Sequence, residues 1–505
     1  MPITSVTIDR RNIFDVNDST FWALKIVNAL HIPTRTPFIR RELLFAPGQP
    51  YDSASVAESG RNLRLLGVFS DVRIDTVRSD SGMAINVMTR DGWSTRPDFR
   101  FHSTGGSLAY TFALIEENLL GTMTQAQLLY QKDPDRTSKV AFFNRPRLID
   151  GKIGTTLEYA DQSDGKFFTG QLGLPYYSLS SRDEATVDFT RQDGRVLRYR
   201  FGSTVAHDTL ERQYVLGRID IGHALRASPR GYVRIGLLGQ IRRDDYDSAS
   251  NAVLLGVNTQ TLSGAFGGYI EWRHAQYLPV HGYESFARQE DVDLSQVVRV
   301  SALIAPRGLG YDRDGIAPGL GVHSGLRLPG GFAFADLTIN GLFQAGGLDS
   351  GQVLLGGTAV FLPGHRHEFL LHAEAGAIRN PAPGSEFDLG FGVGPRAFVQ
   401  HAFTGDREFF TTAEYRYTLW PEAIKLTGIG VAVFADDGGA WWANDGQRTG
   451  SDFGIGLRIG PSRTPDVEAT RIDFARRIGN DAQPGGWVLI VGKGFAFTAS
   501  PRGGR

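Results

Sequence analysis

From Pro97 onward the chain repeats one pattern: segments of about 8–12 residues alternate apolar and polar side chains, and turn-forming residues separate them. In residues 214–222, Val215, Ile219 and Ile221 share one face of a strand, whereas Arg218 and Asp220 lie on the other. This part of the sequence shows no helical periodicity. We therefore expect it to consist of β-strands.

The polar face of these segments is charged repeatedly along the chain. Polar positions of alternating segments are occupied by Glu374, Glu414, Arg416, Arg471 and Asp473. A soluble β-sandwich solvates its polar face, whereas a membrane barrel encloses it and points its apolar face at lipid. The pattern continues for roughly 400 residues, well beyond the ~250 at which soluble all-β domains usually end. We therefore predict that residues 96–505 form an antiparallel transmembrane all-β barrel.

The number of strands is expected to be even, so that both ends of the barrel emerge on the same side of the membrane. At roughly 25 residues for each strand and its connection, the span holds about sixteen strands. Strand boundaries are least distinct in residues 195–345. Aromatic residues near strand ends are expected to form belts at the lipid interface: Tyr176, Tyr177, Trp272, Tyr277, Trp420, Trp441 and Trp442.

The composition of the 505 residues agrees with a barrel and excludes several other classes. Glycine (62 residues) and phenylalanine (32 residues) are abundant, and no stretch approaches the ~18 consecutive apolar residues of a membrane-spanning helix. The chain has no cysteine, which excludes disulfides, thiolate metal sites and cysteine nucleophiles. The formal net charge of -1 gives no indication of a nucleic-acid partner.

Residues 1–95 differ from the rest because they mix alternating and helical patterns. Strands are predicted at 3–9, 70–77 and 82–90, and helical segments at 21–31, from 36 onward and from 53 onward, with Ser53 or Ser55 as the cap of the last. The result is a small β-α-α-β-β domain. The first residues lack the charged and apolar regions of a secretory signal, so if the protein is exported, we expect this sequence to begin after the cleavage site or at a misplaced start.

Four strings in the second part of the chain are informative together: residues 114–122 (LIEENLLGT), 142–154 (FFNRPRLIDGKIG), 390–417 and 430–442 (GVAVFADDGGAWW). Their order resembles the BamA/TpsB superfamily of outer-membrane assembly and secretion proteins, the bacterial surface antigen family. Residues 62–75 and 86–93 are similar to the end of a polypeptide-transport-associated (POTRA) domain. The resemblance implies a POTRA-like periplasmic domain at 1–95, followed by an outer-membrane barrel at 96–505.

The resemblance also implies a specific contact inside the barrel. The family carries a Val-Arg-Gly-Phe/Tyr motif in a loop folded into the lumen, and residues 395–398 (Pro-Arg-Ala-Phe) match it at Arg396 and Phe398. An inward-facing Phe-x-Asp-x-Gly motif holds that arginine, and it is matched here by Phe434, Asp436 and Gly438. A guanidinium inside a barrel needs a partner, and arginine offers a bidentate fork to a carboxylate.

Two further interpretations stay open at this point. Asp437 and Gly438 could instead form a hairpin turn, with Arg396 as a solvated loop residue. The final strand, 487–497, ends at Phe497 and resembles the terminal signal of outer-membrane barrels; Gly492 and Gly494 would weaken its pairing. In the family's assembly members the first and last strands form a lateral gate, here 98–105 against 487–497, although glycines also serve strand curvature.

No enzyme is expected. The chain contains no G-x-S-x-G nucleophile motif, and residues 365–368 (His-Arg-His-Glu) lie at a Pro-Gly turn without a third metal ligand in view. We expect no cofactor and no metal. The resemblance implies an outer-membrane factor that inserts barrel proteins, with lipids and unfolded client polypeptides as partners and accessory lipoproteins as further candidates. A two-partner-type secretion pore and a passive structural barrel are the alternatives.

Overall fold

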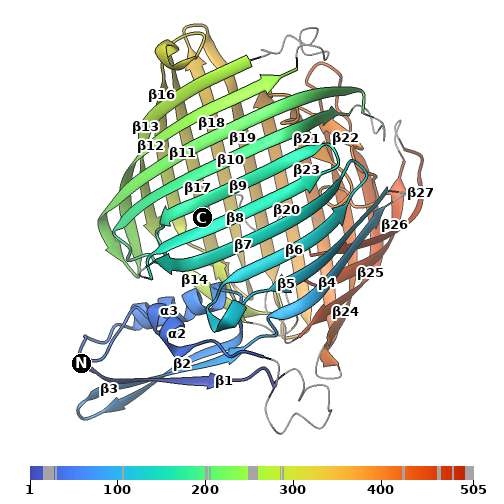
Figure 1. The fold of residues 1–505 in the computed structure, drawn as a ribbon. Helices are drawn as coiled ribbons and strands as arrows, with labels where there is room; N and C mark the ends of the chain where they lie inside the picture. Colours follow the sequence, from blue (N-terminus) through green and yellow to red (C-terminus); the bar gives the residue numbers. More distant parts are fainter. Residues whose placement is uncertain are drawn as a thin grey trace.

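The computed structural model describes residues 1–14, 28, 31–104, 107–149, 151–199, 203, 206–247, 260–284, 286, 289–423, 427–462, 468–479 and 483–494. A small N-terminal domain lies against one end of a closed β-barrel (Figure 1). We refer to this end as the domain end and to the opposite end as the loop end. Among the described residues, no helix has the length and apolar character needed to cross a membrane.

In its described residues, the N-terminal domain has a three-stranded sheet and the helices α2 and α3. Its elements are β1 (Ile3–Arg11), α2 (Thr36–Arg41), α3 (Ser53–Leu65), β2 (Phe69–Ser79) and β3 (Gly82–Asp91). The sheet order is β1-β3-β2, with β1 parallel to β3, so β1 and β2 are its edges. The helical segment expected at 21–31 falls almost entirely outside the described residues.

Helix α3 begins at Ser53, as expected, but its N-cap is a different residue. The carboxylate of Asp52 accepts hydrogen bonds from the backbone N–H groups of Ala54 and Ser55, so Asp52 is the N-cap, and the expectation of Ser53 or Ser55 was wrong. The apolar face of α3 contributes Val56 and Leu63 to the domain core. An aspartate accepts hydrogen bonds from the same free N–H groups as a serine would, so the helix was predicted correctly although its cap residue was not.

The barrel consists of twenty antiparallel strands, and its last strand returns to its first. The strands are β4 (Thr95–Thr104), β5 (Ser107–Glu116), β6 (Gln125–Lys132), β7 (Thr137–Ile149), β8 (Ile153–Gln162), β9 (Gly165–Leu174), β10 (Asp183–Arg198), β11 (Asp208–Ser228), β12 (Gly231–Tyr246), β13 (Gln260–His274), β16 (Gln296–Ala305), β17 (Gly315–Leu328), β18 (Gly331–Gln344), β19 (Gly347–Phe361), β20 (His367–Arg379), β23 (Arg407–Ala423), β24 (Thr427–Trp441), β25 (Gly450–Pro461), β26 (Thr470–Ile478) and β27 (Gly486–Lys493).

The expected count of about sixteen strands was wrong, although the even parity was correct. The strands run from residue 95 to residue 493, so each strand with its connection takes about 20 residues rather than 25. Connections of only two residues contribute to the difference. They join β8 to β9, β11 to β12, β17 to β18 and β18 to β19, and the last three lie in or at the end of the stretch where strand boundaries were least distinct.

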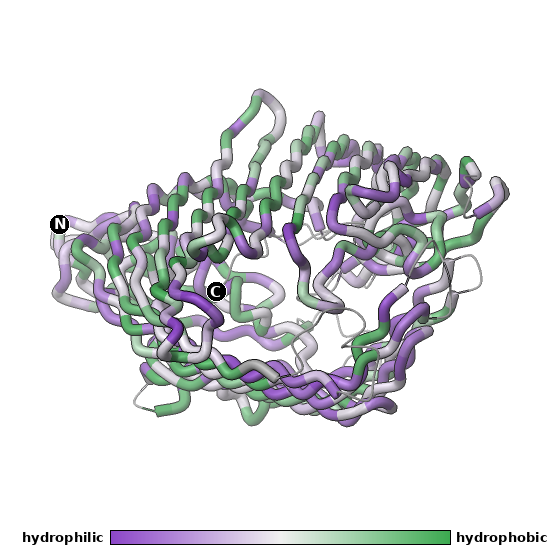
Figure 2. Tube along the Cα trace, turned by 90° about the horizontal axis from the view of Figure 1, so that it is seen from above, coloured by the Kyte–Doolittle hydropathy of each residue, from purple (hydrophilic) through white to green (hydrophobic). Residues whose placement is uncertain are grey.

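Hydrophobic and hydrophilic residues alternate along the strands, as expected (Figure 2). Leu237 and Leu489 are more than 60% exposed on the outside, whereas Asp436 and Asp473 of the lumen face are buried. The expected aromatic belt is only partly present. Trp272 and Trp420 are exposed, but Tyr176 lines a cavity inside the barrel.

Among the described residues, two short hairpins are not part of the barrel wall. At the domain end, β14 (Tyr277–His281) pairs with β15 (Gln289–Asp293) in the connection from β13 to β16. At the loop end, β21 (Phe387–Leu389) pairs with β22 (Phe403–Gly405) in the connection from β20 to β23. Each connection thus carries structure of its own and packs against the lumen face of the wall.

Candidate functional site

The connection from β20 to β23, residues 380–406, folds into the barrel from the loop end. Its central residues are buried: Arg396 is 1% exposed, and Ala397 and Phe398 are 0% exposed. Phe398 packs with Leu389 and Phe403 of the same connection and with Ala440 of β24. We call residues 380–406 the lumen loop.

The Arg396 side chain joins the lumen loop to the barrel wall. Its Nε donates to Asp436 Oδ2 at 2.6 Å and its Nη2 to Asp436 Oδ1 at 3.1 Å, which is the bidentate fork that arginine forms with a carboxylate. Nη1 donates to Glu414 Oε2 at 2.9 Å. The guanidinium also lies 3.7 Å from the centre of the Phe434 ring, within the range of a cation–π contact.

The acidic partners of Arg396 do not depend on it equally. Glu414 also accepts hydrogen bonds from Arg416 Nε at 2.6 Å and from Arg458 Nη2 at 3.0 Å. Asp473 lies 3.5 Å from the Arg396 guanidinium and accepts a hydrogen bond from Arg458 Nη1 at 2.5 Å. Asp436 instead accepts its hydrogen bonds in this group from Arg396 and from the Thr412 hydroxyl. Asp436 is therefore the carboxylate that most requires Arg396.

The structure brings Arg396, Phe398, Phe434 and Asp436 into one neighbourhood. Gly438 lies apart from the guanidinium and serves the strand instead. It pairs with Phe410 of β23, and an added Cβ would lie 2.7 Å from the carbonyl oxygen of Phe409. Because β24 runs without a break through Gly438, the alternative of a hairpin turn at Asp437 and Gly438 was wrong.

Alanine at the family's glycine position is accommodated. Ala397 packs with Phe434, Ala475 and Ile490, and its backbone N–H donates to Asp452 Oδ2 at 3.0 Å. The position that requires a glycine is instead in the barrel wall, at Gly450 of β25, where the Phe398 ring of the lumen loop lies against the backbone. A Cβ at that position would lie 2.2 Å from Phe398 Cζ. The sequence reasoning did not identify Gly450, because nothing local marks the strand glycine that faces an aromatic ring from a distant loop.

The sequence reasoning also missed a second attachment of the lumen loop, at the turn between β6 and β7. His401 Nε2 lies 3.1 Å from Asp135 Oδ2 in the turn between β6 and β7, and Nδ1 contacts Asp388. The imidazole stacks on Tyr199, whose hydroxyl donates to Asp135 Oδ1 at 2.5 Å. Gln400 Nε2 donates to Asp135 as well, at 2.9 Å.

The charge on His401 depends on its two carboxylate partners. Burial by itself lowers the pKa of His401, but the hydrogen bonds to Asp135 and Asp388, and their negative charges, outweigh burial and raise the pKa to about 9. His401 is therefore protonated near neutral pH and forms two charge-assisted contacts. The lumen loop is therefore held at two separate places on the wall, by Arg396 on β23 and β24 and by His401 beside β6.

The seam where the barrel closes is its weakest junction among the described strands. Strands β27 and β4 share a single paired position, Val491 with Ser103, whereas β26 and β27 share eight and β4 and β5 share ten. Lys493 Nζ adds an ion pair to Asp98 Oδ1 at 3.0 Å across the seam. Few main-chain hydrogen bonds therefore oppose separation at this junction.

Of the residues singled out in the terminal strand, the structure describes Gly492 and Gly494. An added Cβ on Gly492 would lie 2.9 Å from Arg471 Nε, so this glycine makes room for a buried arginine of β26. Gly494 has a φ of +65° and lies against the Glu468 carboxylate. Phe497 lies outside the described residues.

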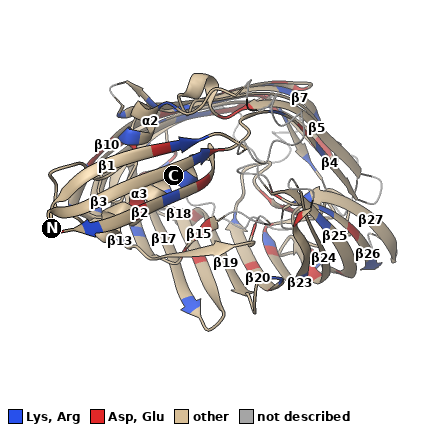
Figure 3. Cartoon of the chain, turned by 90° about the horizontal axis from the view of Figure 1, so that it is seen from below, with Lys and Arg blue, Asp and Glu red and all other residues tan. Residues whose placement is uncertain are grey.

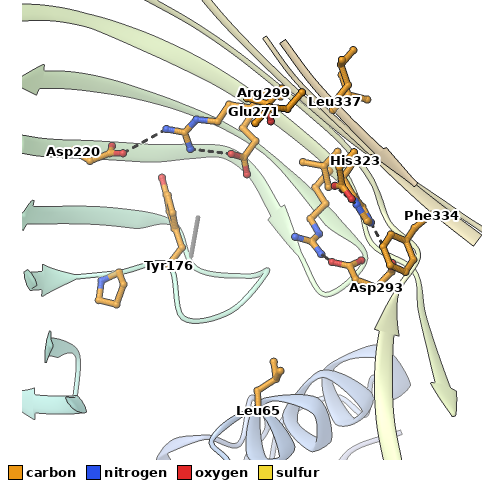
Figure 4. Close-up of a pocket in the computed structure, with 18 of the residues that line it drawn as sticks. Leu65, Tyr176, Asp220, Glu271, Asp293, Arg299, His323, Phe334 and Leu337 are labelled. Carbon is orange, nitrogen blue, oxygen red and sulfur yellow. Dashed lines mark hydrogen bonds and ion pairs between the residues drawn. The ribbon is translucent and has the colours of Figure 1, made fainter. Parts of the chain in front are cut away.

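A cavity of about 1470 Å³ occupies the lumen between the lumen loop and α3 (Figure 4). Its wall is charged in both signs. Arg299 lies between Asp220, at 3.6 Å, and Glu271, at 3.0 Å, and Leu65 of α3 borders the cavity at the domain end. Among the residues that the structure describes, no group of three or more His, Asp or Glu side chains is placed to hold a metal ion.

The N-terminal domain is attached to the barrel by ion pairs. Arg147 of β7 donates from Nε and Nη2 to Glu42 at 2.9 and 3.0 Å, and all these side chains are buried. Glu58 of α3 accepts a hydrogen bond from the Leu179 backbone N–H at 2.6 Å. Burial raises the pKa of Glu58 in spite of that bond. Figure 3 shows the domain across one side of this end of the barrel.

Comparison with known proteins agrees with the resemblance found in the sequence. No family model matches the chain. A segment of 139 residues, 26% of the chain, is 27% identical to the outer membrane protein assembly factor BamA of Neorickettsia risticii, and it spans only 18% of that relative's length. The resemblance to the BamA/TpsB superfamily is thereby confirmed by a curated sequence.

Among solved structures, a BamA and a CdiB protein align with nearly the whole chain. BamA of Haemophilus ducreyi lacking POTRA domains 1–3 covers 98% of this chain and 85% of its own length, with 12% identity and a TM-score of 0.42. CdiB of Escherichia coli covers 97% and 76%, with 11% identity and a TM-score of 0.48. The closed barrel, its apolar outer face and the match to an outer-membrane factor make this chain an outer-membrane β-barrel.

Proposed function

We propose that this protein inserts β-barrel proteins into the outer membrane, with its N-terminal domain in the periplasm. The observation that carries the proposal is the seam between β27 and β4, where the barrel closes through one paired position. An unpaired strand edge in lipid is costly, so an opened seam offers main-chain groups on which a client strand can pair. The work of insertion would come from folding of the client itself.

The N-terminal domain is proposed to receive the client. Its sheet has outer edges at β1 and β2, and among the described residues no further strand pairs with either. Such an edge binds an extended polypeptide through main-chain hydrogen bonds, with little demand on its sequence. Unfolded polypeptides are the proposed clients, lipids the surrounding partners, and accessory lipoproteins further candidates. We propose neither an enzymatic activity nor a cofactor.

A disulfide across the seam tests this proposal, because the natural chain has no cysteine. The double variant Ser103→Cys with Val491→Cys joins the paired position of β4 and β27, and directly opposed strand residues lie within the reach of a disulfide. The control variant Phe474→Cys with Leu489→Cys joins β26 to β27 on the same outer face.

The assay is the rate at which an unfolded barrel client folds into liposomes containing the protein. We expect the oxidised seam variant to lose the acceleration over empty liposomes and to regain it on reduction, while the control keeps it in both states. Equal activity of the oxidised and reduced seam variant would refute lateral insertion. No acceleration by the natural chain would refute the insertion function as a whole.

A polypeptide secretion pore is the second candidate, and the lumen cavity favours it. A client that crosses through the lumen does not need the seam, so the oxidised seam variant would still export its client. The lumen loop argues against a passive barrel, because Arg396 and His401 hold this loop inside the barrel. A large steady conductance in planar bilayers, unaffected by Arg396→Ala, would favour the passive barrel.

A further inference from the structure

The β14–β15 hairpin lies between the N-terminal domain and the barrel wall. Its strands are antiparallel, with Leu278 opposite Val292 and Pro279 opposite Asp291. Side chains of a strand alternate between its two faces, so Val280 and Val292 point one way and Tyr277 and Asp291 the other. The two faces meet different partners.

One face of the hairpin packs against the lumen side of the barrel wall. Val280 and Val292, both less than 10% exposed, belong to one buried apolar cluster with Phe332 of β18, Val360 of β19 and Leu370 of β20. This cluster lies at the domain end of those strands. The hairpin is therefore attached to the wall by apolar contact along its length.

The far end of the hairpin reaches across to β24 and β25. Phe286 lies over glycines of these strands: a Cβ added to Gly428 would lie 2.1 Å from Phe286 Cγ, and one added to Gly460 would lie 3.3 Å from its ring. Glycines at these positions make room for the aromatic ring. The hairpin thus spans from β13, where it begins, to the wall that holds Arg396.

The other face of the hairpin meets α3 of the N-terminal domain. Arg64 donates to Asp291 from Nε at 2.6 Å and from Nη2 at 3.0 Å, a bidentate pair that is mostly buried. One turn earlier on the helix, the Arg61 guanidinium lies 3.9 Å from the centre of the Tyr277 ring. A movement of α3 would therefore act directly on the hairpin.

The hairpin also contacts the charged network that holds the lumen loop. The carbonyl oxygen of Tyr283 accepts a hydrogen bond from Arg416 Nη1 at 3.3 Å. Arg416 in turn donates from Nε to Glu414 Oε1 at 2.6 Å, and Glu414 Oε2 is the acceptor of Arg396 Nη1. Three consecutive contacts therefore link the hairpin to the arginine of the lumen loop.

We propose that the β14–β15 hairpin couples the position of the N-terminal domain to the attachment of the lumen loop. The pair between Arg64 and Asp291 lets α3 hold the hairpin against the wall, so when α3 is displaced, for example by a bound client, this pair breaks and the hairpin moves away from the wall. Arg416 then loses its contact with Tyr283, and water reaches the network around Glu414. Ion pairs weaken as their surroundings become more polar, so the attachment of Arg396 weakens and the lumen loop is released.

The coupling is independent of any client and can be measured on the protein alone. Val399 of the lumen loop is 8% exposed, and the variant Val399→Cys introduces the only thiol of the chain. The rate at which a maleimide labels this cysteine, in protein reconstituted into liposomes, reports how often the loop leaves its place. The measurement succeeds or fails separately from the insertion assay.

Two ion-pair variants with this reporter separate the proposal from simple loosening of the domain. Asp291→Asn weakens the attachment of α3 to the hairpin, whereas Glu42→Gln weakens the attachment to β7 at Arg147, which does not involve the hairpin. We expect Asp291→Asn to raise the labelling rate about fivefold or more, the lower range of usual coupling between sites, and Glu42→Gln to leave it unchanged. Equal rates for the two variants would overturn the proposal.

A third variant keeps the test decisive if Asp291→Asn does not fold, as judged by near-UV circular dichroism. Phe286→Ala removes the contact of the hairpin with β24 and β25 and is expected to raise the labelling rate as well. In a chain that already carries Arg396→Lys, both variants should add little, because the network they act on is already weakened. Full additivity with Arg396→Lys would contradict the proposed route through Glu414.

Discussion

Replacing Arg396 with methionine tests the attachment of the lumen loop most directly. Methionine fills much of the arginine volume but removes the fork to Asp436 and the bond to Glu414. Glu414 and Asp473 keep Arg458, so the substitution mainly leaves Asp436, 3% exposed, with two neutral hydrogen-bond donors, the Thr412 hydroxyl and the backbone N–H of residue 396, in place of the guanidinium. The damage is therefore concentrated on one buried carboxylate.

The expected magnitude follows from that isolated charge. Removing one partner of a buried ion pair usually costs about 3–5 kcal/mol, because the other charge stays buried without compensation. The control is Arg191→Met, which breaks the pair with Asp193 on side chains that are 59% and 34% exposed. An exposed pair of this kind contributes less than about 1 kcal/mol.

The assay is urea unfolding of the barrel in lipid vesicles, followed by tryptophan fluorescence. We expect Arg396→Met to lower the unfolding midpoint strongly with little change in slope, which identifies a loss of stability rather than of native compactness. The double variant Arg396→Met with Asp436→Asn should be more stable than Arg396→Met alone, because the stranded charge is gone. A small effect of Arg396→Met, equal to that of Arg191→Met, would refute the reasoning, and so would strict additivity in the double variant.

Three further variants probe other contacts. The pKa of His401 is raised to about 9, so its contact with Asp135 stabilises the loop fully below the usual histidine pKa of about 6.5 and is lost as pH rises through about 9. Protease cleavage of the loop should therefore increase across this pH range in the natural chain and not in His401→Gln. Gly450→Ala should cost about 1–3 kcal/mol in urea unfolding by overpacking against Phe398, and Phe398→Leu in the same chain should relieve it. Asp52→Ala removes the N-cap of α3 and should cost about 1 kcal/mol, seen as faster proteolysis of the N-terminal domain.

Sequence patterns identified Arg396 and Asp436, the two ends of one long-range contact, but could not show which other side chains surround them. Arg396 and Asp436 carry motifs of their own, and the structure places them in a bidentate pair. Nothing near Glu414 in the sequence distinguishes it from any other charge on a lumen face, yet three arginines converge on it. Which charges meet is decided by strand register, and register is not contained in alternation.

The strand count shows a similar limit. Alternation identifies strands but says little about where one ends when only two residues separate it from the next, as between β17 and β18. The estimate of sixteen rested on an average length, and the tight connections of this barrel made that average too large. The hairpin β14–β15 has strands of five residues each, too short to stand out from a connecting loop in the sequence.

Alternation along the chain was enough to predict a barrel with an apolar outside and a charged inside, because a period of two residues assigns every strand side chain to a face. The number of strands that close the barrel, the weak junction of β27 with β4 and the contacts that hold the lumen loop became visible only in the folded chain. His401 and Asp135 are 266 residues apart and meet because twenty strands curve back on themselves. Closure of the barrel is a property of all the strands together, so the contacts it creates leave no local mark in the sequence.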